Sequence, residues 1–191
     1  MAKTLFFDTE TNGLGQFRPT PTHRIVQMSW ITYDNEEKNY FISDGARNIS
    51  YRVPHDITIP FLKEHGVPFD AVFREWMRDI QEMGSSGVVV AHNVSYDMGC
   101  LLNELNVRHY PKETLEFVKS LKTLCTMKTS TGFCKLPSAY SEYKWPKMEE
   151  LYMKLHNGEK PDAKLHDSLE DCRVLREIFL KGKSQIPKWK L

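Results

Sequence analysis

A short valine-rich run that passes directly into a helical pattern is the feature that most constrains the fold of this chain. Residues 87–92 (GVVVAH) are mostly β-branched and too few for a helix, whereas residues 93–105 (NVSYDMGCLLNEL) carry Met98, Leu101 and Leu105 at helical spacing. A strand that leads straight into a helix is the beginning of a βα unit. Because βα units build parallel sheets that helices cover, we expect an α/β fold.

The first part of the chain predicts strands that reverse direction. Residues 4–7 are apolar and β-prone and run into a turn-forming stretch, DTETNGLG. Residues 23–43 then contain two extended runs, separated by Asp34, Asn35 and Glu36, which favour a tight reversal. The first three strands are therefore expected to be antiparallel.

Helical spacing indicates most of the remaining elements. Apolar residues recur at this spacing from Phe69 to Met83, and Gly84 follows where a left-handed C-terminal cap would lie. Three more helices are expected within residues 112–120, 145–157 and 165–180, and one short strand within residues 121–126. Together these elements predict one domain over residues 1–191, a mixed sheet with an antiparallel side and a helix-covered parallel side.

The charge balance excludes a protein that coats nucleic acid with its whole surface. The 191 residues include 26 Lys and Arg against 25 Asp and Glu, a formal net charge of +1. Broad affinity for a phosphate backbone needs an excess of basic residues. Any contact with nucleic acid is therefore expected to be local.

The cysteines and the amino terminus predict a protein of a reducing compartment. Cys100, Cys125, Cys134 and Cys172 are widely spaced without a C-x-x-C pair, which favours neither a zinc ribbon nor a disulfide framework. The N-terminal MAKTLFFDTE reaches an acidic residue too early for a signal peptide, and no apolar run approaches the roughly 20 residues that span a bilayer. We expect free thiols, no membrane contact, and a cytosolic protein, or a nuclear one in a eukaryote.

Acidic residues follow two strands that a parallel sheet would bring together. Asp8 and Glu10 are two residues apart, so both carboxylates project from one face if the strand continues. Asp97 lies in the first turn of the helix after the valine-rich run, with Asn93 or Ser95 as the expected N-cap. If these strands are parallel neighbours, the three acids share a pocket at their carboxyl ends. Each group alone has an ordinary explanation, a solvated strand end or an acid that complements a helix dipole.

A third acidic group lies at the start of the last helix. Asp167 and Glu170 fit a variant of the capping box, so this helix is expected to begin at Ser168. His166 then precedes the helix and Asp171 lies within it. A loop histidine can turn toward the same pocket as Asp171, although a solvent-facing histidine is the ordinary alternative.

The order of the three groups resembles that of the DEDDh exonucleases, the DnaQ-like family that removes nucleotides from 3′ ends. The matching stretches are FFDTETNGL (Asp8, Glu10), AHNVSYD (Asn93, Asp97) and HDSLED (His166, Asp171), supported by RIVQMSW and YKWPKMEEL. They extend over nearly the whole chain. The resemblance implies a ribonuclease-H-like fold, a mixed five-stranded sheet flanked by helices, in a freestanding exonuclease.

The resemblance also implies a catalytic site with two divalent ions, Mg²⁺ or Mn²⁺. Such ions stabilise the attacking hydroxide and the leaving oxygen in phosphodiester hydrolysis, and carboxylates are the hard ligands they prefer. Asp8, Glu10 and Asp171 would hold the ion that activates water, Asp8 would bridge to the second ion, and Asp97 would contribute directly or through water. His166 would accept the proton of the attacking water.

Two further regions are expected to bind the substrate. By resemblance, the turn of Thr11, Asn12, Gly13 and Leu14 would meet the terminal nucleotide, with Leu14 against its base. Residues 119–147 carry six lysines and one acid, interleaved with aromatic side chains, a composition suited to tracking a single strand or, alternatively, to a solvated loop. The residues expected to bind substrate are Thr11, Asn12, Gly13, Leu14, Asn93, Trp145 and Lys147.

The leading hypothesis is a 3′-to-5′ exonuclease that releases 5′-mononucleotides from single-stranded or frayed DNA, without a nucleotide cofactor. DNA is favoured over RNA because DTETNGL resembles the DNA-trimming branch and Leu14 would present an apolar surface to the sugar. An RNA exonuclease is the close alternative. A nonenzymatic nucleic-acid-binding scaffold and an endonuclease of the broader group are less favoured, since no acid is lost and the H-x-x-x-x-D motif is present. The oligomeric state is left open.

Overall fold

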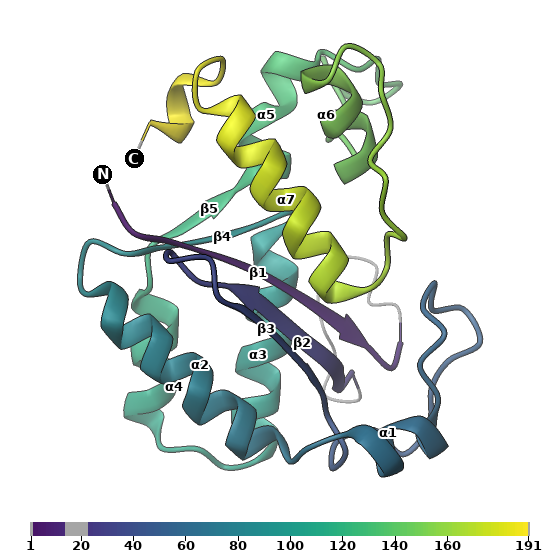
Figure 1. Ribbon diagram of the computed structural model, residues 1–191, viewed down its shortest axis with the longest axis vertical. Coiled ribbons are helices and arrows are strands. Elements are labelled where there is room, and N and C mark those ends of the chain that lie inside the picture. Colours follow the sequence, from purple (N-terminus) through teal and green to yellow (C-terminus); the bar gives the residue numbers. More distant parts are fainter. Residues whose placement is uncertain (1, 14–22, 191) are drawn as a thin grey trace.

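A mixed β-sheet lies between two groups of helices in the computed structural model of the protein, which describes residues 2–13 and 23–190 (Figure 1). Within these residues the sheet has five strands in the order β3-β2-β1-β4-β5. The strands are β1 (Thr4–Thr11), β2 (Ile25–Ile31), β3 (Glu37–Phe41), β4 (Val88–Ala91) and β5 (Thr123–Cys125). β1 pairs antiparallel with β2 and parallel with β4, and β2 pairs antiparallel with β3. The expected mixed sheet is confirmed.

The central strand β1 supplies apolar side chains to both faces of the sheet. Leu5 and Phe7 pack into one hydrophobic core, while Phe6 packs into the other, because successive side chains point to opposite faces. The same alternation continues to the polar end of the strand, so Asp8 and Glu10 share the face of Phe6. β1 thus carries its two acids beyond its apolar residues, on one face of the sheet.

One face of the sheet is covered by the helices α2 (Phe69–Met83), α3 (Val94–Val107) and α4 (Lys112–Ser120). The amphipathic pattern of α2 is confirmed, with Phe69, Phe73 and Trp76 buried against the strands. Gly84 follows with φ of 70°, a left-handed conformation that glycine adopts without steric cost. This end of α2 is as the sequence predicts.

The other face is covered by α5 (Thr126–Cys134), α6 (Met148–Leu155) and α7 (Ser168–Gly182), followed by a 3₁₀ turn (Pro187–Trp189). α7 crosses β1 and β2, and its amino-terminal end lies near the carboxyl end of β1 (Figure 1). Trp189 packs directly on Gly182, where a Cβ atom would lie 2.2 Å from the indole ring. No helix among the described residues combines the length and apolar character that crossing a membrane requires.

Two helices were absent from the sequence prediction. α1 (Ile59–His65) begins with Thr58, whose hydroxyl accepts a hydrogen bond from the amide of Phe61, and has a proline in its first turn. These are ordinary start signals, but seven residues are too few to show helical periodicity. α5 contains four threonine and serine residues and a glycine, which have low helix propensity, and it depends on packing through Met127 and Cys134.

The four cysteines are free thiols, as predicted. Cys100, Cys134 and Cys172 are buried and Cys125 is partly buried. Cys172 lies on α7 and its sulfur lies 3.4 Å from the carbonyl oxygen of Ser29. These thiols therefore serve as small core side chains.

Candidate active site

The carboxyl end of β1 provides two buried acids. Asp8 and Glu10 are each 9% exposed, and their side chains lie on the α7 face of the sheet. In the ladder with β2 they pair with Ser29 and Gln27, and the pairing becomes irregular just after Glu10. Irregular pairing of this kind ends the regular strand and turns the chain beside the site.

The helix that follows β4 adds a third acid. Asp97 lies in the first turn of α3 and is 3% exposed. Its Oδ1 atom accepts hydrogen bonds from the backbone amide of Thr9 (3.2 Å) and from the hydroxyl of Thr9 (3.0 Å). Because Thr9 lies between Asp8 and Glu10, these bonds fasten Asp97 to the acidic end of β1. The parallel pairing of β1 with β4 therefore brings the two motifs together, as expected.

The start of α7 is docked on the sheet by a buried polar network. Asp167 caps the helix and accepts hydrogen bonds from the amides of Leu169 (3.0 Å) and Glu170 (3.2 Å). Gln27 of β2 accepts a bond from the amide of Ser168 (3.2 Å) and donates one to Asp167 (3.1 Å). The predicted helix start is confirmed. The reciprocal half of the capping box is wrong, since the carboxylate of Glu170 pairs with Arg173 instead.

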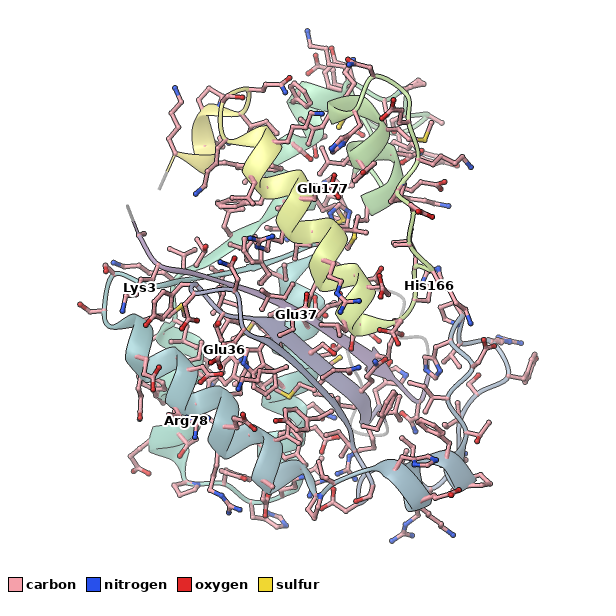
Figure 2. All side chains as sticks on the ribbon, viewed as in Figure 1. Lys3, Glu36, Glu37, Arg78, His166 and Glu177 are labelled. Carbon is pink, nitrogen blue, oxygen red and sulfur yellow. The ribbon has the colours of Figure 1, made fainter. Side chains whose placement is uncertain are left out.

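This docking brings His166 and Asp171 to the end of β1. The amide of His166 donates to Oδ2 of Asp171 (3.2 Å), and His166 has a left-handed backbone with φ of 74°. Ligand atoms of Glu10, His166 and Asp171 all lie within 4.8 Å of one another, a separation that a single metal ion can bridge. Figure 2 shows His166 beside the first turn of α7. We call the carboxylates of Asp8, Glu10, Asp97 and Asp171 the acid cluster.

Burial and mutual repulsion make the acid cluster costly to ionise. Burial raises the pKa of Glu10 to about 8 and the pKa values of Asp97 and Asp171 to about 7. The pKa of Asp8 is also raised well above its ordinary value, first by burial and then by the charges of Asp97, Asp171 and Glu10. Raised pKa values of this kind gather at functional sites, and bound cations would favour the ionised forms.

The side chain of His166 is more exposed to solvent than the carboxylates of the acid cluster, although part of it is buried. Partial burial lowers the pKa of His166 below its ordinary value, and the charges of His55 and Lys147 act in the same direction. At neutral pH the imidazole is therefore mostly neutral and able to accept a proton.

A cleft of about 650 Å³ opens over these residues. All five expected catalytic residues line it, together with Asn93, Trp145 and Lys147 from the expected substrate-binding set. The remaining lining residues are Thr9, His92, Tyr96, Met127, Pro146, Met148, Glu149 and Leu165. Trp145 lines this cleft and is 54% exposed, so part of its side chain is open to a ligand.

The family of the chain follows from a sequence comparison. The model of the RNase T family, described as exonuclease, matches residues 5–179, which include every member of the acid cluster. The chain belongs to this exonuclease family. The fold agrees with this membership, since the sheet with flanking helices is the ribonuclease-H-like fold that the sequence predicted. A comparison with curated proteins gave no match.

Solved structures with the same fold include several of exonuclease I. Escherichia coli exonuclease I in complex with a dA16 oligonucleotide is 15% identical, with a TM-score of 0.64 over 99% of this chain and 42% of that chain. A product-bound exonuclease I is 14% identical, with a TM-score of 0.66 over 98% of this chain and 45% of that chain. The present chain thus spans less than half the length of these proteins. At such low identity the likeness establishes the fold.

The turn after β1 is held by the protein itself. The hydroxyl of Thr11 bonds to the carbonyl of Gly13 (2.7 Å) and to the hydroxyl of Tyr96 (3.0 Å). The side chain of Asn12 accepts a bond from the amide of Arg24 (2.7 Å) and donates one to the carbonyl of residue 48 (3.2 Å). Thr11, Asn12 and Gly13 are not among the cleft-lining residues, and Leu14 lies outside the described residues. Contact between this turn and a nucleotide stays a prediction.

The lysines of residues 119–147 do not form one surface. Lys147 lines the cleft, and the ammonium of Lys128 lies 5.6 Å from the centre of the Trp145 ring. Lys144 pairs with Glu150, and Lys122 lines a separate pocket at residues 80–87 and 117–122. The basic segment is therefore divided, and only part of it lies near the cleft.

Sequence reasoning missed three polar residues around the cleft. His92 directly follows β4 and bonds to Thr126 and Pro146, and Tyr96 bonds to Thr11. The ring of His55 lies 2.9 Å from the carbonyl oxygen of Thr11. His92 and Tyr96 stand inside the AHNVSYD motif, so their position at a strand end could have indicated them. His55 lies in an irregular stretch where the sequence offers no such signal.

Proposed function

We propose that this exonuclease is a metal-dependent 3′-to-5′ enzyme that releases 5′-mononucleotides from single-stranded or frayed DNA. The observation that carries this proposal is the acid cluster beside a neutral histidine at one open cleft. The family supplies the reaction class, and the cleft supplies room for the end of a strand.

The residues of the site fit a divalent cation. Oδ1 of Asp171 is fully buried and has no hydrogen-bond partner among the described residues, although buried acceptors are normally paired. Glu10 lies close enough to share one ion with it. The raised pKa values of the carboxylates also support a cation site, because a bound cation offsets both the desolvation of the carboxylates and their mutual repulsion.

One Mg²⁺ or Mn²⁺ ion would be held by Asp8, Glu10 and Asp171. Asp8 would also contact a second ion, and Asp97 would bind the ions directly or through water. Such ions supply the positive charge that phosphodiester hydrolysis needs at its attacking and leaving oxygens. Thr9 keeps the Asp97 carboxylate at the end of β1 through its two hydrogen bonds. The protein's own contribution is thus a rigid set of oxygen ligands.

His166 would accept the proton of the attacking water. Its lowered pKa keeps the ring neutral at pH 7, and its exposure at the cleft lets the ring reach a water molecule. The positive φ of His166 and its amide bond to Asp171 hold the backbone at the mouth of the cleft.

One side of the cleft would bind the DNA strand. This side is formed by Trp145, Pro146 and Lys147, and we call it the 145–147 wall. An exposed indole and an ammonium group suit a base and a phosphate of a single strand. Asn93 makes no side-chain capping bond to α3 among the described residues, so its amide is available to the substrate. Exonuclease I binds single-stranded DNA in its solved complexes, which supports DNA as the substrate here.

Matched DNA and RNA oligonucleotides labelled at the 5′ end test the proposal. With Mg²⁺ or Mn²⁺, a ladder shortening stepwise from the 3′ end, with 5′-mononucleotide products and faster cleavage of DNA, is expected. Blunt duplex should be cut more slowly, because unpairing the end costs a few kcal/mol. Faster cleavage of RNA would overturn the choice of sugar, and internal cuts would overturn the exonuclease direction.

A further inference from the structure

His92 lies partly buried at the junction between β4 and the 145–147 wall. It directly follows β4 and lines the cleft. One ring nitrogen, Nε2, lies 3.0 Å from the carbonyl oxygen of Pro146, and the other, Nδ1, lies 3.0 Å from the hydroxyl of Thr126. The ring thus joins β4 to two segments that follow it in the chain by more than 30 residues.

Hydrogen bonding fixes which form of the ring is present. The Pro146 carbonyl can only accept, so Nε2 carries the proton and donates it. Nδ1 of the neutral ring then accepts from the Thr126 hydroxyl (3.0 Å), whose other possible acceptor, the carbonyl oxygen of Ala91, is farther away at 3.3 Å. Burial lowers the pKa of His92 to about 4, so the ring stays neutral at physiological pH. Both nitrogens are therefore satisfied in a single tautomer, and the ring has one orientation.

The two segments that His92 holds also meet each other. Thr126 begins α5, and Lys128 on the same helix places its ammonium 5.6 Å from the centre of the Trp145 ring. The Lys128 ammonium also bonds to the hydroxyl of Ser95 (3.3 Å) in the first turn of α3. The Trp145 indole is thus linked to the carboxyl end of β4 in two ways. One runs through His92 and Pro146, and the other runs through Lys128 and Ser95.

We infer that His92 is a positioning residue that sets the 145–147 wall for binding the single strand. It acts through Pro146 and Thr126 and not on the reacting phosphate. This inference rests on the proposed function, because the wall matters only if it binds nucleic acid. The substrate contact most dependent on His92 is the one made by the Trp145 indole.

The test measures binding apart from cleavage. The dissociation constant of a 5′-fluorescein-labelled oligothymidylate is measured by fluorescence anisotropy in EDTA, where no hydrolysis occurs. His92→Phe keeps a planar aromatic ring and removes both hydrogen bonds, so the dissociation constant should rise about tenfold, within the range that loss of base stacking produces. In steady-state cleavage with Mg²⁺, KM should rise by a similar factor while kcat falls less than about threefold.

His156→Phe is the matched control. His156 is a buried histidine whose ring, like that of His92, bonds to a carbonyl oxygen, that of Tyr152, but it lies at the end of α6 away from the cleft. This variant should bind the oligonucleotide as the wild type does. If both histidine variants lose affinity equally, the effect is one of general stability and the inference fails.

A double-mutant cycle distinguishes positioning from other effects. If His92 acts through the wall, His92→Phe should weaken binding much less in a Trp145→Ala background than in the wild type. Fully additive losses would overturn the inference. Should His92→Phe fail to fold, Thr126→Val removes one of the two bonds and should raise the dissociation constant about threefold, and an unchanged constant would overturn it.

Failure of the proposed function gives a different result. In that case the wild type itself neither binds the oligonucleotide nor shortens it. If the wild type binds and cleaves the oligonucleotide but His92→Phe binds it equally well, the inference about His92 is wrong and the proposed function still holds.

Discussion

The acid cluster and the 145–147 wall line one cleft but are held in different ways. Each carboxylate of the acid cluster stands on a strand or a helix, and each is buried. The wall lies in the irregular stretch between α5 and α6, and its Trp145 and Lys147 side chains are exposed. The cluster is therefore preorganised by the fold, whereas the wall depends on a few side-chain contacts.

This difference matches what each region has to do. Metal ligands must stay within a few tenths of an ångström of their positions, which a docked helix and a paired strand can ensure. A surface that binds a nucleic-acid strand of any sequence needs exposed aromatic and basic side chains more than it needs a fixed geometry. Changes in the acid cluster should therefore alter the chemical step, and changes in the wall should alter affinity.

The largest expected effect is that of Asp8→Asn. Because Asp8 is the proposed ligand shared by both ions, cleavage of a labelled oligonucleotide should fall by roughly 10³-fold or more. The variant should remain folded, since one of several repelling carboxylates is removed. The exposed Asp162→Asn is the control and should cleave normally. Undiminished cleavage by Asp8→Asn, or by the wild type in excess EDTA, would contradict the metal assignment.

His166→Ala should slow kcat by about 10² to 10⁴ and leave Mn²⁺ affinity nearly unchanged, if its ring only transfers a proton. The wild type should lose rate on acidification as the imidazole becomes protonated. Because the ring of His166 lies close to Glu10 and Asp171, it could instead bind the metal ion. Calorimetric titration of His166→Ala with Mn²⁺ tests this alternative. A variant that mainly binds Mn²⁺ more weakly would make His166 a ligand instead.

Trp145→Ala should weaken oligonucleotide binding by about 5- to 150-fold, the equivalent of losing one stacked base. Its kcat should change little, in contrast to the acid-cluster variants. Tyr140→Ala is the matched control, because Tyr140 is a fully exposed aromatic of the same segment that does not line the cleft. Equal losses in the two variants would show that the cleft does not bind the strand through its wall.

The smallest expected effect concerns stability without metal. The raised pKa values of Glu10, Asp97 and Asp171 mean that the folded state holds more protons than the unfolded chain between about pH 4 and pH 8. The free energy of unfolding therefore falls as pH rises through this window. In EDTA, Tm should decrease by roughly 5 °C from pH 5 to pH 8, and Mg²⁺ should reverse the loss more at pH 8. Asp171→Asn should show a smaller decrease.

Several features of the site followed from signals that act over a few residues. The alternation of β1 placed Asp8 and Glu10 on one face, and the Asp167 cap located the start of α7. The valine-rich run placed Asp97 one turn beyond the end of β4. Such signals are local because a strand's alternation and a helix cap are set by neighbouring side chains and backbone groups.

Other features required the folded chain. The short distances among Glu10, His166 and Asp171 depend on α7 docking across β1 and β2, which the buried Gln27 secures. The links from His92 to Thr126 and Pro146 join residues 34 and 54 positions apart. No pattern within a segment encodes such distances, because they arise when sheet order and helix packing bring remote residues together and buried polar groups must then find partners.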